Sequence, residues 1–170
     1  MKHSAYHIRP IQASDNSAIQ AVIQTVMPEF GAIGPGFSIT DPEVSQMFEN
    51  YQSAHARYFV AIAADSGQVI GGAGIGPLVG ASEEYAELKK MYVLAEHRQR
   101  QLGYQLMQHC LNFAIAAQYQ FIYLETLKTM ERAQSLYESF GFQQLAEALG
   151  STGHHGCDRY YLLKLDANIV

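Results

Sequence analysis

The chain has 170 residues, a formal net charge of −5 and a pI of about 5.7. This length favours one domain that buries roughly two thirds of its unfolded surface, and the acidic balance argues against nucleic acid as a partner. No apolar run is long enough to span a bilayer, and residues 1–10 are too polar for a signal sequence, so we expect a cytoplasmic protein without a membrane partner.

The first half of the chain predicts a strand, two helices and a hairpin. Residues 6–11 alternate as a short strand, and residues 13–27 carry apolar side chains at helical spacing behind good capping residues. Residues 40–51 predict a second helix, with Asp41 as its N-cap and a proline at the first helical position. Residues 56–78 predict a hairpin that turns at residues 65–67.

The second half predicts alternating strands and helices. Strands are expected at 84–94, 120–126, 142–149 and 158–165. An apolar stripe from Leu106 to Ile115 and another within residues 130–140 predict helices, the second ended by Gly141. The order β-α-α-β-β-β-α-β-α-β-β predicts one α/β domain over residues 1–170, with a mixed, twisted sheet flanked by helices.

Two local patterns suggest phosphate binding. The glycine-rich run GGAGIG at residues 71–76 resembles a dinucleotide-binding loop, but no helix follows it directly. We therefore interpret it as a small-residue strand, where a ligand could approach the backbone closely. Residues 96–107, EHRQRQLGYQLM, instead place arginines and glutamines where a helix begins. The free N–H groups and partial positive charge of a helix start suit an anion such as phosphate.

The element order and two motifs resemble the GNAT superfamily, the GCN5-related N-acetyltransferases, over nearly the whole chain. The family signature, Arg/Gln-x-x-Gly-x-Gly/Ala, fits residues 98–103, with Gln101 in place of the first glycine. A second register over residues 100–105 would keep that glycine at Gly103 but lose the last small residue. The Leu106-Met107 pair behind Gly103 favours the first register. The segment AQSLYESFGF, residues 133–142, matches the second family motif at each specified position.

The resemblance implies a GNAT-like fold and acetyl-CoA as co-substrate. It implies that loop amides and side chains of Arg98, Gln99, Arg100, Gln101, Leu102, Gly103 and Tyr104 hold the pyrophosphate, although the arginines could also lie in a solvated loop. We expect Gln101 to have a negative φ, as at an ordinary helix start. The backbone of Met91, Tyr92 and Val93 is expected to pair with the pantetheine arm as a sheet edge pairs with a peptide.

Two residues are candidates for catalysis. An alkylammonium group is neutral in only about 1 molecule in 2,500 at pH 7, so a base near the acceptor can matter greatly. Glu87 lies eleven positions before Arg98, which is the spacing of the catalytic glutamate in the histone acetyltransferase branch of the family. The alternative is a glutamate that is solvated or paired with Lys89 or Lys90. Tyr137 resembles the family's general acid, and the alternative is a core tyrosine.

Two loops are expected to border the acceptor site. In the resembling family the loop at residues 151–158 lies beside the acceptor pocket, so we expect His154 and His155 to contact the acceptor, together with Phe30 from residues 29–37. This loop also contains two histidines, Cys157 and an aspartate, which are residue types that bind metal ions. Adjacent histidines rarely bind one ion, however, and the sequence has no second ligand cluster, so we expect no metal. Cys110 is expected to be a buried thiol, and the two cysteines form no disulfide framework.

The leading hypothesis is an acetyl-CoA-dependent N-acetyltransferase that acts by direct attack of a small-molecule amine or an accessible protein amine. The alternative is a non-catalytic acyl-CoA-binding or sensor module with the same fold. The presence of both Glu87 and Tyr137 favours the enzyme, and Gln101 favours the sensor. The sequence identifies no acceptor, and a homodimer is left open.

Overall fold

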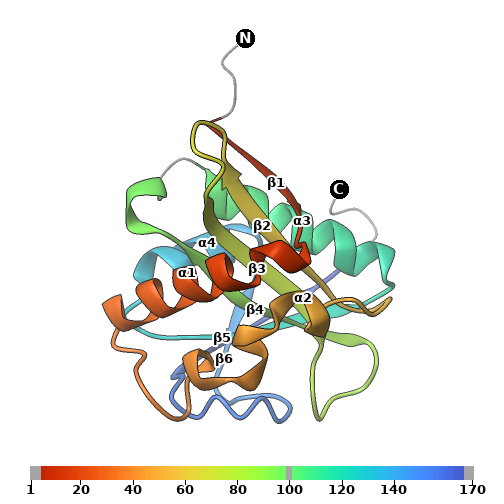
Figure 1. Ribbon diagram of the computed structural model, residues 1–170. Coiled ribbons are helices and arrows are strands. Elements are labelled where there is room, and N and C mark those ends of the chain that lie inside the picture. The colour runs from red at the N-terminus through yellow and green to blue at the C-terminus, as the bar shows by residue number, and fades with distance from the viewer. Residues whose placement is uncertain (1–4, 99–100, 167–170) are drawn as a thin grey trace.

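A seven-stranded mixed sheet forms the centre of the part of the chain that the structure describes, residues 5–98 and 101–166 of a computed structural model (Figure 1). The strand order is β1-β2-β3-β4-β5-β7-β6, and neighbours are antiparallel except β4 and β5. The strands are β1 (Tyr6–Pro10), β2 (Arg57–Ala63), β3 (Val69–Pro77), β4 (Tyr85–Val93), β5 (Phe121–Thr126), β6 (Gln143–Leu145) and β7 (Arg159–Lys164). The α-helices are α1 (Asn16–Glu29), α2 (Met47–Asn50), α3 (Leu102–Ala116) and α4 (Glu131–Ser139), and the 3-10 helices are η1 (Ala13–Asp15), η2 (Ser38–Thr40), η3 (Pro42–Ser45) and η4 (Ala95–His97).

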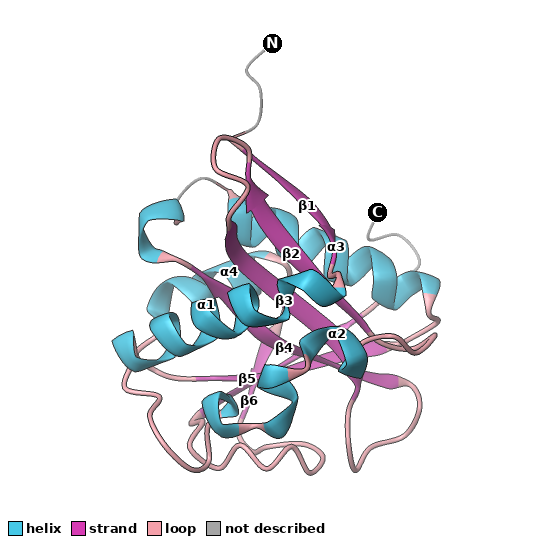
Figure 2. Cartoon of the chain, in the orientation of Figure 1, coloured by secondary structure: helices cyan, strands magenta, loops and turns pink. Residues whose placement is uncertain are grey.

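Each face of the sheet has its own hydrophobic core, because successive side chains of a strand point to opposite faces. In β2, Phe59 and Ala61 belong to the core shared with α3 and α4, whereas Tyr58 and Val60 belong to the core shared with α1 and α2. Figure 2 shows these two helix pairs on opposite sides of the sheet. Every β2 residue after Arg57 is buried, as expected for a strand covered on both faces.

The predicted order of elements is confirmed, and one predicted helix is wrong. The hairpin turn and the end of α4 contain Gly67 and Gly141 at φ 70° and 92°, as the turn and cap positions require. Residues 40–51, however, form the 3-10 helix η3 and the single turn α2 in place of one helix. The Asp41 side chain makes no capping hydrogen bond, because its carboxylate instead contacts Lys90 and His154.

The glycine-rich run lies in β3, and protein side chains occupy the space beside it. A Cβ atom at Gly72 or Gly74 would lie 2.6 Å from the ring of Tyr58. We expected a ligand to approach the backbone of this run closely, but the ring of Tyr58 occupies that position. The Tyr58 hydroxyl donates a 2.8 Å hydrogen bond to the backbone carbonyl of Lys90. Lys90 has φ 53° at a bulge where the register between β3 and β4 shifts.

The sheet opens between β4 and β5. These parallel strands pair at Tyr85–Phe121, Ala86–Ile122 and Glu87–Tyr123, and their pairing ends there. Both strands nevertheless continue, β4 to Val93 and β5 to Thr126. Side chains and backbone beyond Glu87 are thereby exposed to the space between the strands. Separately, none of the helices in the described ranges is both long and apolar enough to cross a membrane.

Candidate active site

A groove of about 590 Å³ runs along the open end of β4, between α1, α3 and α4. It brings together the predicted cofactor-binding residues that the structure describes: Met91, Tyr92, Val93, Arg98, Gln101, Leu102, Gly103 and Tyr104. Phe30 and Tyr137 also line it. Gln99 and Arg100, predicted in the same set, lie outside the described residues. Residues distant in sequence thus converge on one apolar groove whose rim includes a helix start.

The start of α3 differs from the prediction at Gln101. This residue is the N-cap of α3 and has φ 60° and ψ 7°, a left-handed conformation, where we expected a negative φ. Such a backbone favours glycine, which is the residue that the family motif has at this position in the first register. Gly103, the corresponding glycine of the second register, lies inside α3 and has no positive φ. The backbone therefore supports the first register.

Arg98 packs against the end of α1 at one side of the groove. Its Nε donates to the Val93 carbonyl at 2.8 Å, and its Nη1 lies 2.7 Å from Glu29. The guanidinium stacks 5.3 Å from the centre of the Phe30 ring. Its Nη2 is buried and has no hydrogen-bond partner among the described residues. One donor of this arginine is thus available to an anion in the groove.

Two aromatic residues bound the groove at different depths. Tyr104 is half exposed and packs on Phe140 with ring centres 4.7 Å apart. Tyr137 is buried, contacts both Phe142 and Tyr161, and lines the groove and a second cavity. Burial raises the pKa of Tyr137, so its hydroxyl remains a neutral donor. A raised pKa favours hydrogen bonding to a developing anion over complete proton transfer.

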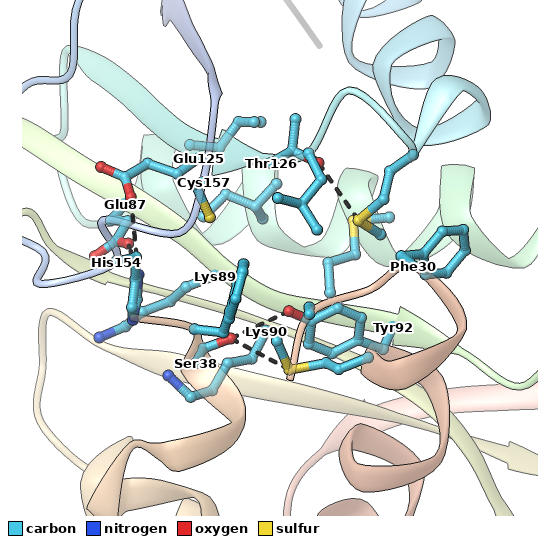
Figure 3. Close-up of a pocket in the computed structure, with 18 of the residues that line it drawn as sticks. Phe30, Ser38, Glu87, Lys89, Lys90, Tyr92, Glu125, Thr126, His154 and Cys157 are labelled. Atoms are coloured by element: carbon cyan, nitrogen blue, oxygen red, sulfur yellow. Dashed lines mark hydrogen bonds and ion pairs between the residues drawn. The ribbon is translucent and has the colours of Figure 1, made fainter. Parts of the chain in front are cut away.

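The second cavity, of about 50 Å³, holds the titratable groups of the site. Glu87, Lys89, Lys90, Glu125, His154 and Cys157 line it, together with Phe30 and Tyr137. Figure 3 shows Glu87, Glu125 and His154 at one end and Phe30 and Tyr92 at the other. Phe30, Met91, Tyr92, Met130 and Tyr137 line both this cavity and the groove. A molecule in the groove can therefore meet one in the cavity at Tyr137.

Glu87 is buried and is not paired with either neighbouring lysine. Its side chain is 5% exposed, and it accepts no hydrogen bond from the described residues. Lys89 and Lys90 contact Glu43, and Lys90 also binds Asp41 at 2.7 Å. Burial is the largest influence on Glu87 and raises its pKa above the ordinary 4.5. A buried carboxylate with free lone pairs and a raised pKa suits a general base.

The two predicted histidines have different environments. His154 is mostly buried, its Nε2 lies 2.9 Å from Asp41, and this contact raises the pKa of the imidazole above 6.5. His155 is exposed, lies beside Gly36 and does not line the cavity. The structure thus brings His154 to Glu87 and leaves His155 outside. The described residues contain no group of three His, Cys, Asp or Glu side chains arranged for a metal ion.

The sequence analysis missed three polar groups of the cavity: Asp41, Glu125 and Cys157. Asp41 was interpreted as a helix cap, and Cys157 only as part of a metal pattern. Burial raises the pKa of the Cys157 thiol to about 12, so it stays neutral. Glu125 had a readable signal, because parallel strands end at the same edge and Glu125 follows Tyr123, the partner of Glu87, by two positions.

Comparisons with known proteins show the family to which the chain belongs. Residues 19–142 match the profile described as the Acetyltransferase (GNAT) family. The chain is 35% identical over 160 residues to the uncharacterized N-acetyltransferase YjgM of Escherichia coli strain K12. The aligned region covers 93% of this chain and 94% of that protein. A GNAT-family acetyltransferase of Staphylococcus aureus Mu50 superposes with a TM-score of 0.78 at 20% identity, covering 95% of this chain and 100% of that one. The protein yncA of Salmonella typhimurium, solved with its cofactor acetyl-CoA, gives a TM-score of 0.77 at 20% identity, covering 98% and 97%. The chain therefore belongs to the GNAT family of acetyltransferases and is an N-acetyltransferase.

Proposed function

We propose that the groove binds acetyl-CoA and that the adjoining cavity receives the amine that is acetylated. The observation that carries this proposal is the meeting of the two spaces at Tyr137. The groove suits the co-substrate on its own features. The start of α3 offers backbone N–H groups to a pyrophosphate, and Arg98 has an unpaired buried donor. The unpaired part of β4 offers a strand edge to an amide-containing arm.

The residues of the cavity divide the chemistry between them. Glu87 takes a proton from the acceptor ammonium, because its raised pKa and free lone pairs make it a base. The neutral amine then forms a bond to the acetyl carbon while the carbon–sulfur bond breaks. Sulfur takes that electron pair and the second proton that nitrogen loses, so the products are an amide, a thiol and one released proton. Tyr137 donates a hydrogen bond to the sulfur as charge develops on it.

Two measurements test this function. CoA should raise the thermal midpoint of the protein by mass action, whereas pantetheine, which lacks the phosphates, should raise it much less. Equal effects of the two compounds would place the site elsewhere. A thiol-release assay with acetyl-CoA over a panel of amines, amino acids and peptides should then find turnover. Binding of CoA without thiol release for any acceptor would favour a sensor module instead.

A further inference from the structure

The acceptor cavity contains three hydrogen-bond acceptors that face one another. His154 Nδ1 lies 3.9 Å from Glu87 Oε1 and 4.0 Å from Glu125 Oε2. The side chains of both glutamates are 5% exposed and that of His154 is 12% exposed. These contacts are too long for hydrogen bonds, and the three side chains line the same end of the cavity (Figure 3).

Asp41 determines which nitrogen of His154 faces that space. An ionised carboxylate can only accept, so the 2.9 Å contact between Asp41 Oδ2 and Nε2 requires the proton on Nε2. The neutral ring consequently presents the lone pair of Nδ1 to Glu87 and Glu125. Among the described residues, no donor reaches Nδ1 within hydrogen-bond distance. Above the pKa of His154, three unprotonated acceptors therefore line one end of the cavity, and they suit a ligand that brings several N–H groups.

The charge balance around the cavity favours a cation. Asp41, Glu43, Glu87 and Glu125 contribute four carboxylates, against the ammonium groups of Lys89 and Lys90. Lys90 is engaged by Asp41 and Glu43, and Lys89 lies 3.8 Å from Glu43 and 5.5 Å from the centre of the Tyr51 ring. Cys157, the remaining titratable group facing the cavity from the His154 loop, is a neutral thiol. Among the described residues that line the cavity, both lysines already contact Glu43 and His154 already contacts Asp41, so none of them is left unpaired for a carboxylate on the acceptor.

We propose that Glu87 Oε1, Glu125 Oε2 and His154 Nδ1 together bind the ammonium group of a primary amine that has no carboxylate on the neighbouring carbon. A primary ammonium has three protons, one for each acceptor, whereas a secondary one leaves an acceptor unpaired. Glu125 also accepts from Tyr123 and Thr152 at 2.8 and 3.0 Å, which hold it in place. This inference rests on the proposed function and specifies the acceptor class of the same site.

The protonation state of His154 controls this site. A protonated Nδ1 carries no lone pair and repels an ammonium, so the amine should bind more weakly as pH falls through the pKa of His154. That pKa lies above 6.5, chiefly because of the hydrogen bond to Asp41. Replacing His154 with Gln removes the titrating ring, so the part of the weakening that follows the pKa of His154 should disappear and only the part due to protonation of Glu87 should remain. His155→Gln, which changes the exposed neighbour, should behave like the unchanged protein.

Matched acceptors test the proposal. Pentylamine and phenethylamine differ from norleucine and phenylalanine only by the carboxylate, and N-methylphenethylamine is the secondary amine of the series. The primary amines should exceed the amino acids and the secondary amine by ~10-fold or more in kcat/KM, because each of the poorer acceptors leaves a buried polar group unpaired. Glu125→Gln should raise KM for phenethylamine by ~10-fold or more and leave CoA binding unchanged, whereas the exposed Glu147→Gln should change neither the KM nor CoA binding.

Binding of the same compounds to the CoA-saturated protein, measured by calorimetry, separates this inference from the proposed function. Selective binding of primary amines that weakens at low pH would support the ammonium site even if no thiol were released. Turnover or binding of the amino acids at least equal to that of the amines would overturn the ammonium site, while the acetyltransferase function would stand. An effect of Glu147→Gln equal to that of Glu125→Gln would also overturn it.

Discussion

The hydrogen bond from Tyr58 to Lys90 fixes the bulge of β4 that lies beside the acceptor cavity, and its removal gives a measurable prediction. Tyr58 is fully buried, and its ring fills the space that Gly72 and Gly74 leave open. Tyr58→Phe keeps the ring but removes the donor 2.8 Å from the Lys90 carbonyl. Depriving a buried carbonyl of its donor costs about 1–3 kcal/mol. For a chain of this length we expect the thermal midpoint to fall by ~2–12 °C.

Tyr119→Phe is the matched control. The Tyr119 hydroxyl donates a 2.7 Å hydrogen bond to the carbonyl of His55, which is an exposed residue. Water can replace this donor, so we expect a loss below about 1 kcal/mol. Thermal unfolding of both variants checks the difference. Equal losses would show that the Lys90 carbonyl is not dependent on Tyr58. Tyr58→Phe should also lower kcat, whereas Tyr119→Phe should not.

Three further substitutions test the site. Glu87→Gln should lower kcat/KM most at low pH and recover towards the unchanged protein as pH approaches the amine's own pKa, and a constant ratio from about pH 6 to pH 10 would refute the base assignment. Because burial raises the pKa of Glu87, the unchanged protein should lose activity as pH is lowered through that pKa, at a pH above 4.5. Tyr137→Phe should retain CoA binding and lose ~10-fold or more in turnover, and unchanged turnover would leave Tyr137 as a core residue. Gln101→Gly should raise the free energy of unfolding by about 0.5–1 kcal/mol, because glycine adopts the left-handed backbone without strain. Gln118→Gly, at φ 64°, is the control: it should stabilise the protein similarly, but only Gln101→Gly should change CoA affinity.

Local signals in the sequence predicted the fold because each depends on neighbouring residues. The hairpin turn, the apolar stripes of the helices and the cap at Gly141 can all be read within a few positions. The same signals failed where distant groups compete. Aspartate is a favoured residue at helix N-caps, yet Asp41 binds Lys90 and His154, which lie 49 and 113 positions away. No periodicity encodes such contacts.

The conformation of Gln101 shows a different limit. The motif predicted that the chain would turn into α3 near this residue, and α3 does begin at the next position. The sign of φ could not be read from the residue type, because glutamine ordinarily avoids the left-handed region. Its glycine-like conformation at the glycine position of the motif indicates that the geometry of the turn persists although the residue differs.

The environments of Glu87 and Glu125 explain why one carboxylate of the pair suits proton transfer. Both extend from the point where β4 and β5 separate, and both face His154 Nδ1. Each oxygen of Glu125 already accepts one hydrogen bond, from Tyr123 or Thr152, and these donors stabilise the negative charge of the carboxylate. Glu87 receives no such donor from the described residues, and its burial raises its pKa. Spacing in the sequence nominated Glu87, but it is this difference in contacts that gives a physical reason for the choice.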